Sequence, residues 1–147
     1  MSWFESEDER AAAAWVEVYE ACALLARQLE AHADRAPYPQ VAERLREIVA
    51  DQEANAQRAG ARLASLGRNT PANGAGQIHD GNSAWERLRV SVEDYRALIR
   101  QLSQLHARWD DDRPEDAALV RQVRERAVAH REILVDLLAR SDSHARD

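Results

Sequence analysis

The sequence predicts an all-α protein, and three observations support that prediction. Apolar residues recur at alternating three- and four-residue steps over four long stretches, which is the spacing of one face of an α-helix. No stretch shows the two-residue alternation of a half-buried strand. Two connections between the stretches are short, whereas the middle one covers residues 67–82. We therefore expect a single domain over 1–147 that contains four helices and one long connection.

The first helix is expected over residues 7–33. Ser6 followed by Glu9 is a capping-box pattern, which marks a helix start. Val16 and Tyr19 widen its apolar stripe onto a second face, and a helix this apolar usually has a second partner. We expect a homodimer through this helix, the other interpretation being simple burial within the bundle. The stripe itself is Trp15, Val18, Cys22, Leu25 and Leu29.

The second helix is expected over residues 39–66. Pro39 suits the first helical position, and Gly67 suits the residue just past the end. Its stripe is apolar at both ends but polar in the middle, where two uncharged amides occupy positions that the pattern assigns to the core. The stripe is Leu45, Ile48, Gln52, Asn55 (or Ala56), Ala59, Leu63 and Leu66.

The third and fourth helices are expected over residues 83–109 and 114–140. Ser83 with Glu86 is another capping-box pattern, and Pro114 falls near the first turn of the last helix. The stripe of the third helix is Trp85, Leu88, Val92, Tyr95, Ile99, Leu102 and His106. The stripe of the fourth is Val120, Val123, Ala127, His130, Leu134 and Leu137.

The connection over residues 67–82 selects the topology. A helix of about 27 residues is roughly 40 Å long, and about 16 extended residues span roughly 50 Å. The connection is therefore long enough to run the whole length of the bundle, so that the second and third helices run parallel. A flexible insertion in an up-down-up-down bundle is the alternative.

Four helices with one long crossover between the second and third resemble the ferritin-like arrangement. The segment WVEVYEACALLARQLEAHA (15–33) is similar to the opening helix of the rubrerythrin-type and smaller bacterial members of that family. The segment EANAQRAGARLASLG (53–67) resembles their common ending of an acidic run, His, a Leu-rich turn and Leu-Gly. The resemblance covers nearly the whole chain.

In that family the first and third helices each give a Glu, and the second and fourth each give a Glu-x-x-His pair. The six ligands hold two iron or manganese ions, and the spacing places both members of a pair on one helix face. The resemblance places the pair of the second helix on Gln52 and Asn55. It places the pair of the fourth helix on Ala127 and His130.

The resemblance places the Glu of the first helix on Cys22, and that of the third on Val92 or Ser91. Of six expected ligands, only His130 is retained. Two ions with a combined charge of four or more need carboxylates around them. We therefore expect no resident metal or other cofactor and a non-catalytic role, the rival being an enzyme or metal-storage protein with a nonstandard site.

In place of the metal centre we expect a neutral, buried polar cluster of Cys22, Gln52, Asn55, Tyr95 and His130. Its members would hydrogen-bond to each other or to a buried water, because buried amides must be satisfied. Such a network fixes the register of the helices. The protein would then have a structural or binding role.

The alternative is a metal-binding or iron and oxidative-stress protein with a nonstandard site. Iron, manganese or zinc would then be held by His130, Cys22, Glu20 and Glu53. For His130 the other interpretations are a core histidine satisfied by a hydrogen bond and a single-metal ligand paired with Cys22. Without a basic neighbour on its own face, Cys22 is expected to be an inert small apolar residue.

Composition limits the remaining function classes. The net charge of −6 gives no basic field for nucleic acid, although all 20 basic residues are Arg. No apolar run reaches the roughly 20 residues that a membrane span needs. A single cysteine excludes an internal disulfide, and the acidic N-terminus lacks the layout of a signal peptide, so we expect the cytoplasm.

Overall fold

A computed structural model describes residues 6–72 and 76–141, and the remainder of the predicted 1–147 domain lies outside the described residues. It contains α1 (Glu7–Asp34), α2 (Pro39–Ser65), α3 (Ala84–Trp109) and α4 (Pro114–Ala139), and no strand within those ranges. The predicted all-α class is confirmed. The helix limits differ from the expected ones by one residue at four of the eight ends.

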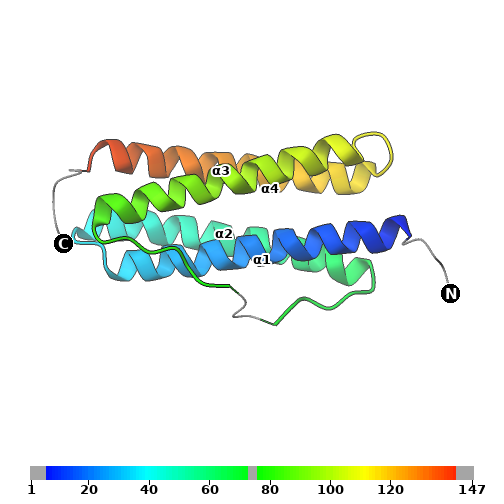
Figure 1. The fold of residues 1–147 in the computed structure, drawn as a ribbon, viewed down its shortest axis with the longest axis horizontal. Coiled ribbons are helices and arrows are strands. Elements are labelled where there is room, and N and C mark those ends of the chain that lie inside the picture. The colour runs from blue at the N-terminus through cyan, green and yellow to red at the C-terminus, as the bar shows by residue number, and fades with distance from the viewer. Residues whose placement is uncertain (1–5, 73–75, 142–147) are drawn as a thin grey trace.

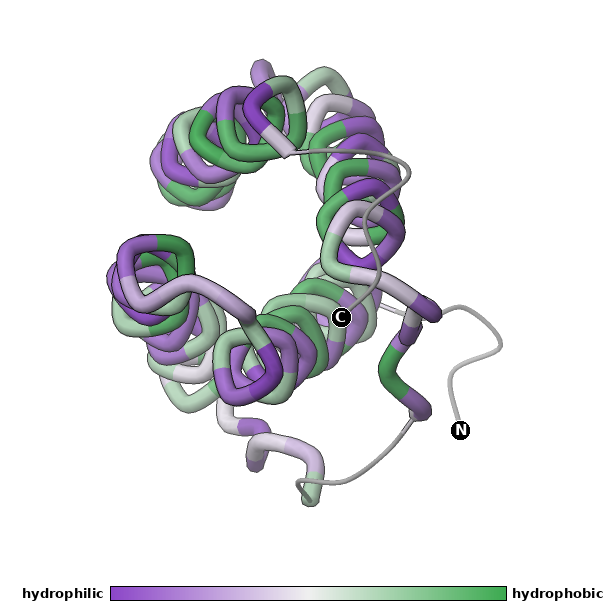
Figure 2. Tube along the Cα trace, turned by 90° about the vertical axis from the view of Figure 1, so that its left-hand side faces the viewer, coloured by the Kyte–Doolittle hydropathy of each residue, from purple (hydrophilic) through white to green (hydrophobic). Residues whose placement is uncertain are grey.

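Two antiparallel helix pairs form the bundle (Figure 1). α1 packs along α2 and α3 along α4, while α1 also contacts α3 and α2 also contacts α4. The crossover between α2 and α3 runs along the outside of the bundle from one end to the other (Figures 1 and 2). α2 and α3 therefore run in the same direction, which is the ferritin-like arrangement that the sequence predicted.

Local sequence accounts for the helix ends. The Ser6 side chain accepts from the Glu9 backbone N–H over 3.1 Å, and the Glu9 carboxylate accepts from the Ser6 N–H over 3.4 Å, which completes a capping box. α2 ends in a Schellman motif: Arg68 N–H donates to the Leu63 carbonyl, and Gly67 has a φ of +75°. Glycine fits there because side chains disfavour positive φ.

A buried carboxylate joins three helices at the end of the bundle where α1 begins. Asp116 of α4 is 1% exposed and accepts from Trp15 Nε1, Arg62 Nε and Arg113 Nε, each over 2.7 Å. The Trp15 ring stacks on Trp109 of α3 with centroids 5.6 Å apart. A buried charge is stable only when it is paired and hydrogen-bonded, and Asp116 meets both conditions.

The crossover covers part of the second apolar face of α1. A Cβ atom on Gly60 would lie 3.1 Å from Thr70 and 3.5 Å from Tyr19, so the crossover passes over this contact between α1 and α2. Further along, Gly76 lies against the side chain of Leu24. The crossover thus covers part of the apolar surface of α1 without a second chain. Among the described residues, no helix is long and apolar enough to cross a membrane.

Candidate functional site

Three buried polar side chains meet in the middle of the bundle, each from a different helix. Gln52 of α2, Tyr95 of α3 and His130 of α4 are at most 1% exposed. The Tyr95 hydroxyl donates to Gln52 Oε1 over 2.9 Å and lies 3.3 Å from His130 Nδ1. His130 Nδ1 lies 3.1 Å from the same Gln52 oxygen. We call these three residues the central polar cluster.

Cys22 orients the cluster through its backbone. Its carbonyl accepts from Gln52 Nε2 over 3.4 Å, which turns Gln52 Oε1 toward Tyr95 and His130. Burial raises the pKa of the Cys22 thiol to about 12, although a hydrogen bond with Gln52 opposes the shift. The thiol is therefore protonated at neutral pH, which makes it a poor nucleophile and a poor metal ligand. Burial also raises the pKa of Tyr95 well above 10, so its hydroxyl remains a donor.

The cluster reaches the surface through a residue that the sequence analysis did not single out. His130 Nε2 hydrogen-bonds to Asp51 Oδ2, and Arg126 Nε donates to the same oxygen over 2.8 Å. Asp51 is 29% exposed. Burial raises the pKa of Asp51, but hydrogen bonds from Arg126 and His130 outweigh burial, and the net pKa is lowered. The site is therefore a neutral core joined to a charged carboxylate.

The protonation state of His130 follows from its two neighbours. Burial lowers the pKa of His130 below its usual 6.5, and the hydrogen bond and charge of Asp51 oppose this shift without reversing it. The neutral ring then carries its proton on Nε2, facing the Asp51 carboxylate. Nδ1 is left to accept from Tyr95, whose single hydroxyl proton is shared between Nδ1 and Gln52 Oε1.

Asn55 does not join the other members of the predicted cluster. Its Oδ1 accepts from Arg58 Nη1 over 2.7 Å, and its Nδ2 has no hydrogen-bond partner among the described residues. Asn55 is nonetheless fully buried, as the helical pattern indicated. The expected contact with Gln52 or His130 is absent because Arg58, one turn further along α2, competes for the amide oxygen.

The residues at the expected ligand positions do not fit a di-metal centre. Val92 and Ala127 are buried and apolar, while the alternative ligands Glu20 and Glu53 lie exposed on the outer faces of their helices. Within 6–72 and 76–141, no three His, Cys, Asp or Glu residues are grouped so that they could hold a metal ion. Both nitrogens of His130 already face protein partners. Among the described residues, Asp51 provides the only carboxylate that hydrogen-bonds to the cluster.

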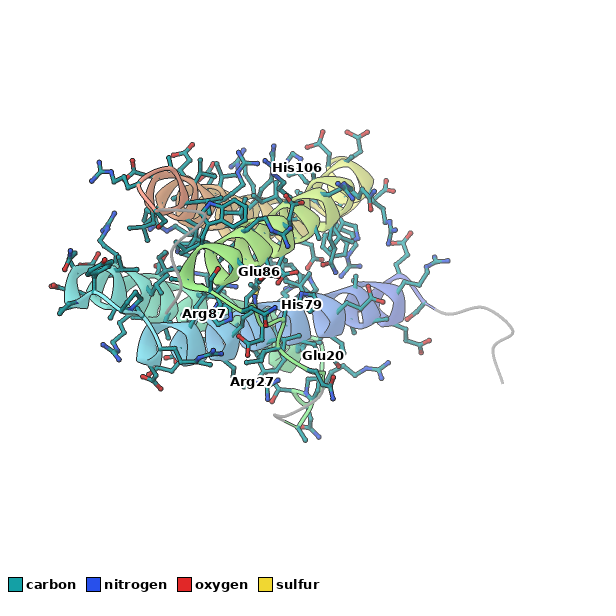
Figure 3. All side chains as sticks on the ribbon, turned by 60° about the vertical axis from the view of Figure 1, so that its left-hand side comes forward. Glu20, Arg27, His79, Glu86, Arg87 and His106 are labelled. Atoms are coloured by element: carbon teal, nitrogen blue, oxygen red, sulfur yellow. The ribbon has the colours of Figure 1, made fainter. Side chains whose placement is uncertain are left out.

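A second polar network fixes the end of the crossover to α1 and α3. Gln28 Nε2 donates to Ser91 Oγ over 3.0 Å and to Asp94 Oδ2 over 2.8 Å. The Gln28 oxygen accepts from the His79 backbone N–H over 2.8 Å, and His79 Nδ1 lies 2.7 Å from Asp94. His32 Nε2 donates to the His79 carbonyl over 3.0 Å. We call these five residues the crossover latch (Figure 3 labels His79 between α1 and α3).

The sequence analysis did not single out His32 and His79. The signal that points to the latch is the pair of polar residues, Gln28 and Ser91, at positions that the helical period turns inward. Next to the latch, Arg35 Nη1 binds both carboxylate oxygens of Asp80 at 2.9 and 2.8 Å. The latch thus joins the end of the crossover to α1 and α3.

Solved structures of low sequence identity share this architecture, whereas no protein-family profile and no curated protein sequence matches the chain. A Dps1 mutant (F47E) from Mycobacterium smegmatis aligns with a TM-score of 0.78 at 14% identity, over 91% of this chain and 99% of that one. A bacterioferritin from Desulfovibrio desulfuricans, solved with its diiron site in different catalytic states, aligns at 0.75 with 19% identity, over 92% and 84%.

A third similar structure is a two-domain protein from Anabaena variabilis with DJ-1/ThiJ/PfpI-like and ferritin-like domains. It aligns with a TM-score of 0.76 at 15% identity, over 99% of this chain but only 42% of that chain. Identities this low establish the fold and nothing about activity. The chain has the ferritin-like four-helix fold.

Proposed function

We propose that this protein is a non-catalytic ferritin-like bundle in which a hydrogen-bonded polar cluster takes the place of a di-metal centre. Its role is then structural or binding, and the surface and the bundle ends carry the function. The observation that supports this most strongly is the engagement of His130. Asp51 faces one ring nitrogen, and Gln52 with Tyr95 faces the other.

The charge of the site supports the same proposal. Gln52 and Tyr95 are neutral, and the Cys22 thiol is protonated because burial raises its pKa. Asp51 contributes one negative charge, which Arg126 already balances over 2.8 Å. The site has almost no negative charge to neutralise a pair of divalent ions. The free energy of removing water from the ions would exceed the free energy gained from neutral ligands.

Metal analysis of the purified protein tests the proposal. Cells are grown with added iron, manganese and zinc, and metal per chain is measured for the wild type, His130→Ala and His106→Ala. His106 lies at the end of α3 outside the cluster, so it is the matched control. The proposal expects far less than one metal per chain in all three proteins. Near-stoichiometric metal that is lost only in His130→Ala would contradict it.

One observation favours the alternative, a metal-binding or oxidative-stress role at a nonstandard site. His130 Nε2 and the Asp51 carboxylate lie together at the edge of the bundle, where Asp51 is partly exposed. The similar bacterioferritin is described with a diiron site. A metal at this edge would have to displace Arg126 from Asp51. Its binding would therefore strengthen in Arg126→Gln and disappear in Asp51→Asn.

We also propose that two chains associate through α1 and that the protein acts in the cytoplasm. A groove between α1 and α2 is lined by residues of these two helices and by no described residue of the crossover. Its walls include Tyr19, Ala23 and Ala26 of α1 and Ala56 of α2, which suit close approach of a second helix pair. Light scattering coupled to size exclusion measures the mass in solution. A dimer that dissociates in Ala23→Arg supports association through α1, and a wild-type monomer refutes it.

A further inference from the structure

A pocket of about 450 Å³ opens at one end of the bundle, opposite the end that holds the buried carboxylate of Asp116. It lies where α1 ends, α2 and α3 begin and α4 ends, and it is separate from the central polar cluster, none of whose residues lines it. Pockets that hold small molecules have volumes of about 300–1,000 Å³. The volume therefore fits one small organic molecule.

The walls of this pocket are apolar and partly aromatic. Tyr38, the residue before α2, is 61% exposed at the pocket, and Trp85 of α3 is half-buried on another side. Val41, Leu88 and Leu137 line it from α2, α3 and α4. An exposed tyrosine and a partly exposed tryptophan beside aliphatic side chains form a surface on which an aromatic ring packs well.

The charged side chains that line the pocket are both cationic. They are Arg87 and Arg140, and no Asp or Glu is among its lining residues in the described part of the chain. Arg87 is only 2% exposed, so its guanidinium acts from a low-dielectric position, where electrostatic interactions are strong. Arg140 lies at the rim and pairs over 3.4 Å with Asp136, an exposed contact of the weak kind.

The start of α2 adds to the positive character of the pocket. Tyr38 occupies the N-cap position without a side-chain hydrogen bond, and the first turn of α2 carries no acidic residue. The partial positive charge of that helix end is therefore not offset by a side chain.

Arg87 has a structural contact besides the role in binding that its place in the pocket suggests. Its Nη2 donates to the Arg35 carbonyl over 3.4 Å at the end of α1. A binding test must distinguish these two roles.

We propose that this pocket binds a small aromatic monocarboxylate, with the ring between Trp85 and Tyr38 and the carboxylate directed at Arg87 and Arg140. The aromatic and aliphatic walls account for the ring, and the two guanidinium groups without an acidic lining residue account for the carboxylate. The site is independent of the central polar cluster and of whether that cluster binds metal.

The test uses 3-phenylpropionate and its neutral isostere 3-phenylpropionamide as probes of the full-length protein. Binding is followed by two-dimensional NMR through the indole N–H signal of Trp85, which is assigned with Trp85→Phe. The proposal expects a saturable shift of this signal and a dissociation constant for the carboxylate at least tenfold lower than for the amide. Equal constants for both probes, or no shift up to 10 mM probe (roughly the weak limit for ligands of this size), would overturn it.

Substitutions then locate the binding. Arg140→Gln should weaken the carboxylate at least threefold and leave the amide unchanged, and Arg87→Gln should weaken it at least tenfold. Val41→Trp should block both probes, whereas Val135→Trp, outside the pocket, should block neither. Circular dichroism checks folding. If Arg87→Gln does not fold, Arg140→Gln and Val41→Trp still test the proposal. Carboxylate binding that is unchanged in both of these variants rejects it.

Discussion

The Tyr95 hydroxyl donates to Gln52 Oε1 over 2.9 Å in the middle of the bundle, and neither side chain is exposed to solvent. This contact joins α2 to α3, the two helices that run parallel and do not pack along each other. The central polar cluster therefore ties together helices that apolar packing alone leaves apart. A network with this position sets the register between the two helix pairs.

Removing the hydroxyl should lower stability measurably. In Tyr95→Phe, Gln52 Oε1 keeps only His130 as a polar neighbour. The neutral His130 ring has no proton on Nδ1 that it could donate to this oxygen. We expect a loss of about 1–3 kcal/mol in the free energy of unfolding, the usual cost of an unsatisfied buried acceptor. Urea denaturation measures it. Tyr38→Phe is the matched control, because Tyr38 is 61% exposed, and an equal effect of both variants would refute a special role for Tyr95.

Stability should rise with pH through the range where His130 titrates. Because burial lowers the pKa of folded His130 below its usual 6.5, the unfolded chain binds more protons than the folded chain near and just below pH 6.5. The stabilisation is complete above pH 6.5 and is lost as pH falls through the folded pKa. His130→Gln should reduce the slope of unfolding free energy against pH between 5 and 7 by at most about 1.4 kcal/mol per pH unit.

Urea denaturation at several pH values gives that slope. Some slope should remain in His130→Gln, because burial also lowers the pKa of His32. The control His106→Gln makes the same substitution at a histidine that lies outside the cluster. An unchanged slope in His130→Gln would show that folding does not shift the pKa of His130, and a steeper slope would show that Asp51 holds the imidazole charged in the folded state.

Neutralising the buried carboxylate of α4 should be more costly than any surface change. Asp116→Asn keeps an acceptor for Trp15 but leaves Arg62 and Arg113, both mostly buried, with only the exposed carboxylates of Glu115 and Asp8. We expect a loss of about 3 kcal/mol, as for other buried pairs that lose one member. The control Asp136→Asn removes an exposed pair with Arg140 and should cost under about 1 kcal/mol. Thermal unfolding of both variants compares the two directly.

Opening the crossover latch should loosen the crossover while leaving the helices intact. Gln28→Leu removes the hydrogen bonds to Ser91, Asp94 and the His79 backbone at once. We expect faster amide hydrogen exchange at residues 77–82 and little change in the middle of α1. Gln57→Leu, on the exposed face of α2, is the control. Unchanged exchange at 77–82 would mean that the remaining contacts of His79 and the Arg35–Asp80 pair hold the crossover without Gln28.

The fold was predictable because its determinants are local and periodic. Ser6, Pro39 and Gly67 mark helix ends by their own chemistry, and the apolar period fixes which faces are buried. The length of the 67–82 connection then separates the ferritin-like topology from a simple bundle. None of these steps requires knowledge of which side chains touch across the bundle.

The site was predictable only in part, because its contacts depend on rotamers and on helix rotation. Burial of Gln52, Tyr95 and His130 follows from the helical period. The engagement of Asp51 does not, because Asp51 lies at the edge of the α2 stripe and reaches His130 through its rotamer. Asn55 shows the converse: it is buried as expected but bonds to Arg58 on its own helix. The pattern of apolar positions along a helix does not reveal such competition between neighbouring side chains.

The central claim is that this bundle lacks the carboxylates a di-metal centre needs, and calorimetric titration tests it most directly. Fe²⁺ (without oxygen) and Zn²⁺ are titrated into the wild type and into a variant with Cys22→Glu, Gln52→Glu, Asn55→His, Val92→Glu and Ala127→Glu. The account predicts no stoichiometric binding to the wild type and about two ions per chain in the variant, the number typical of six such ligands. Two ions bound tightly by the wild type, with the binding lost in His130→Ala, would contradict it.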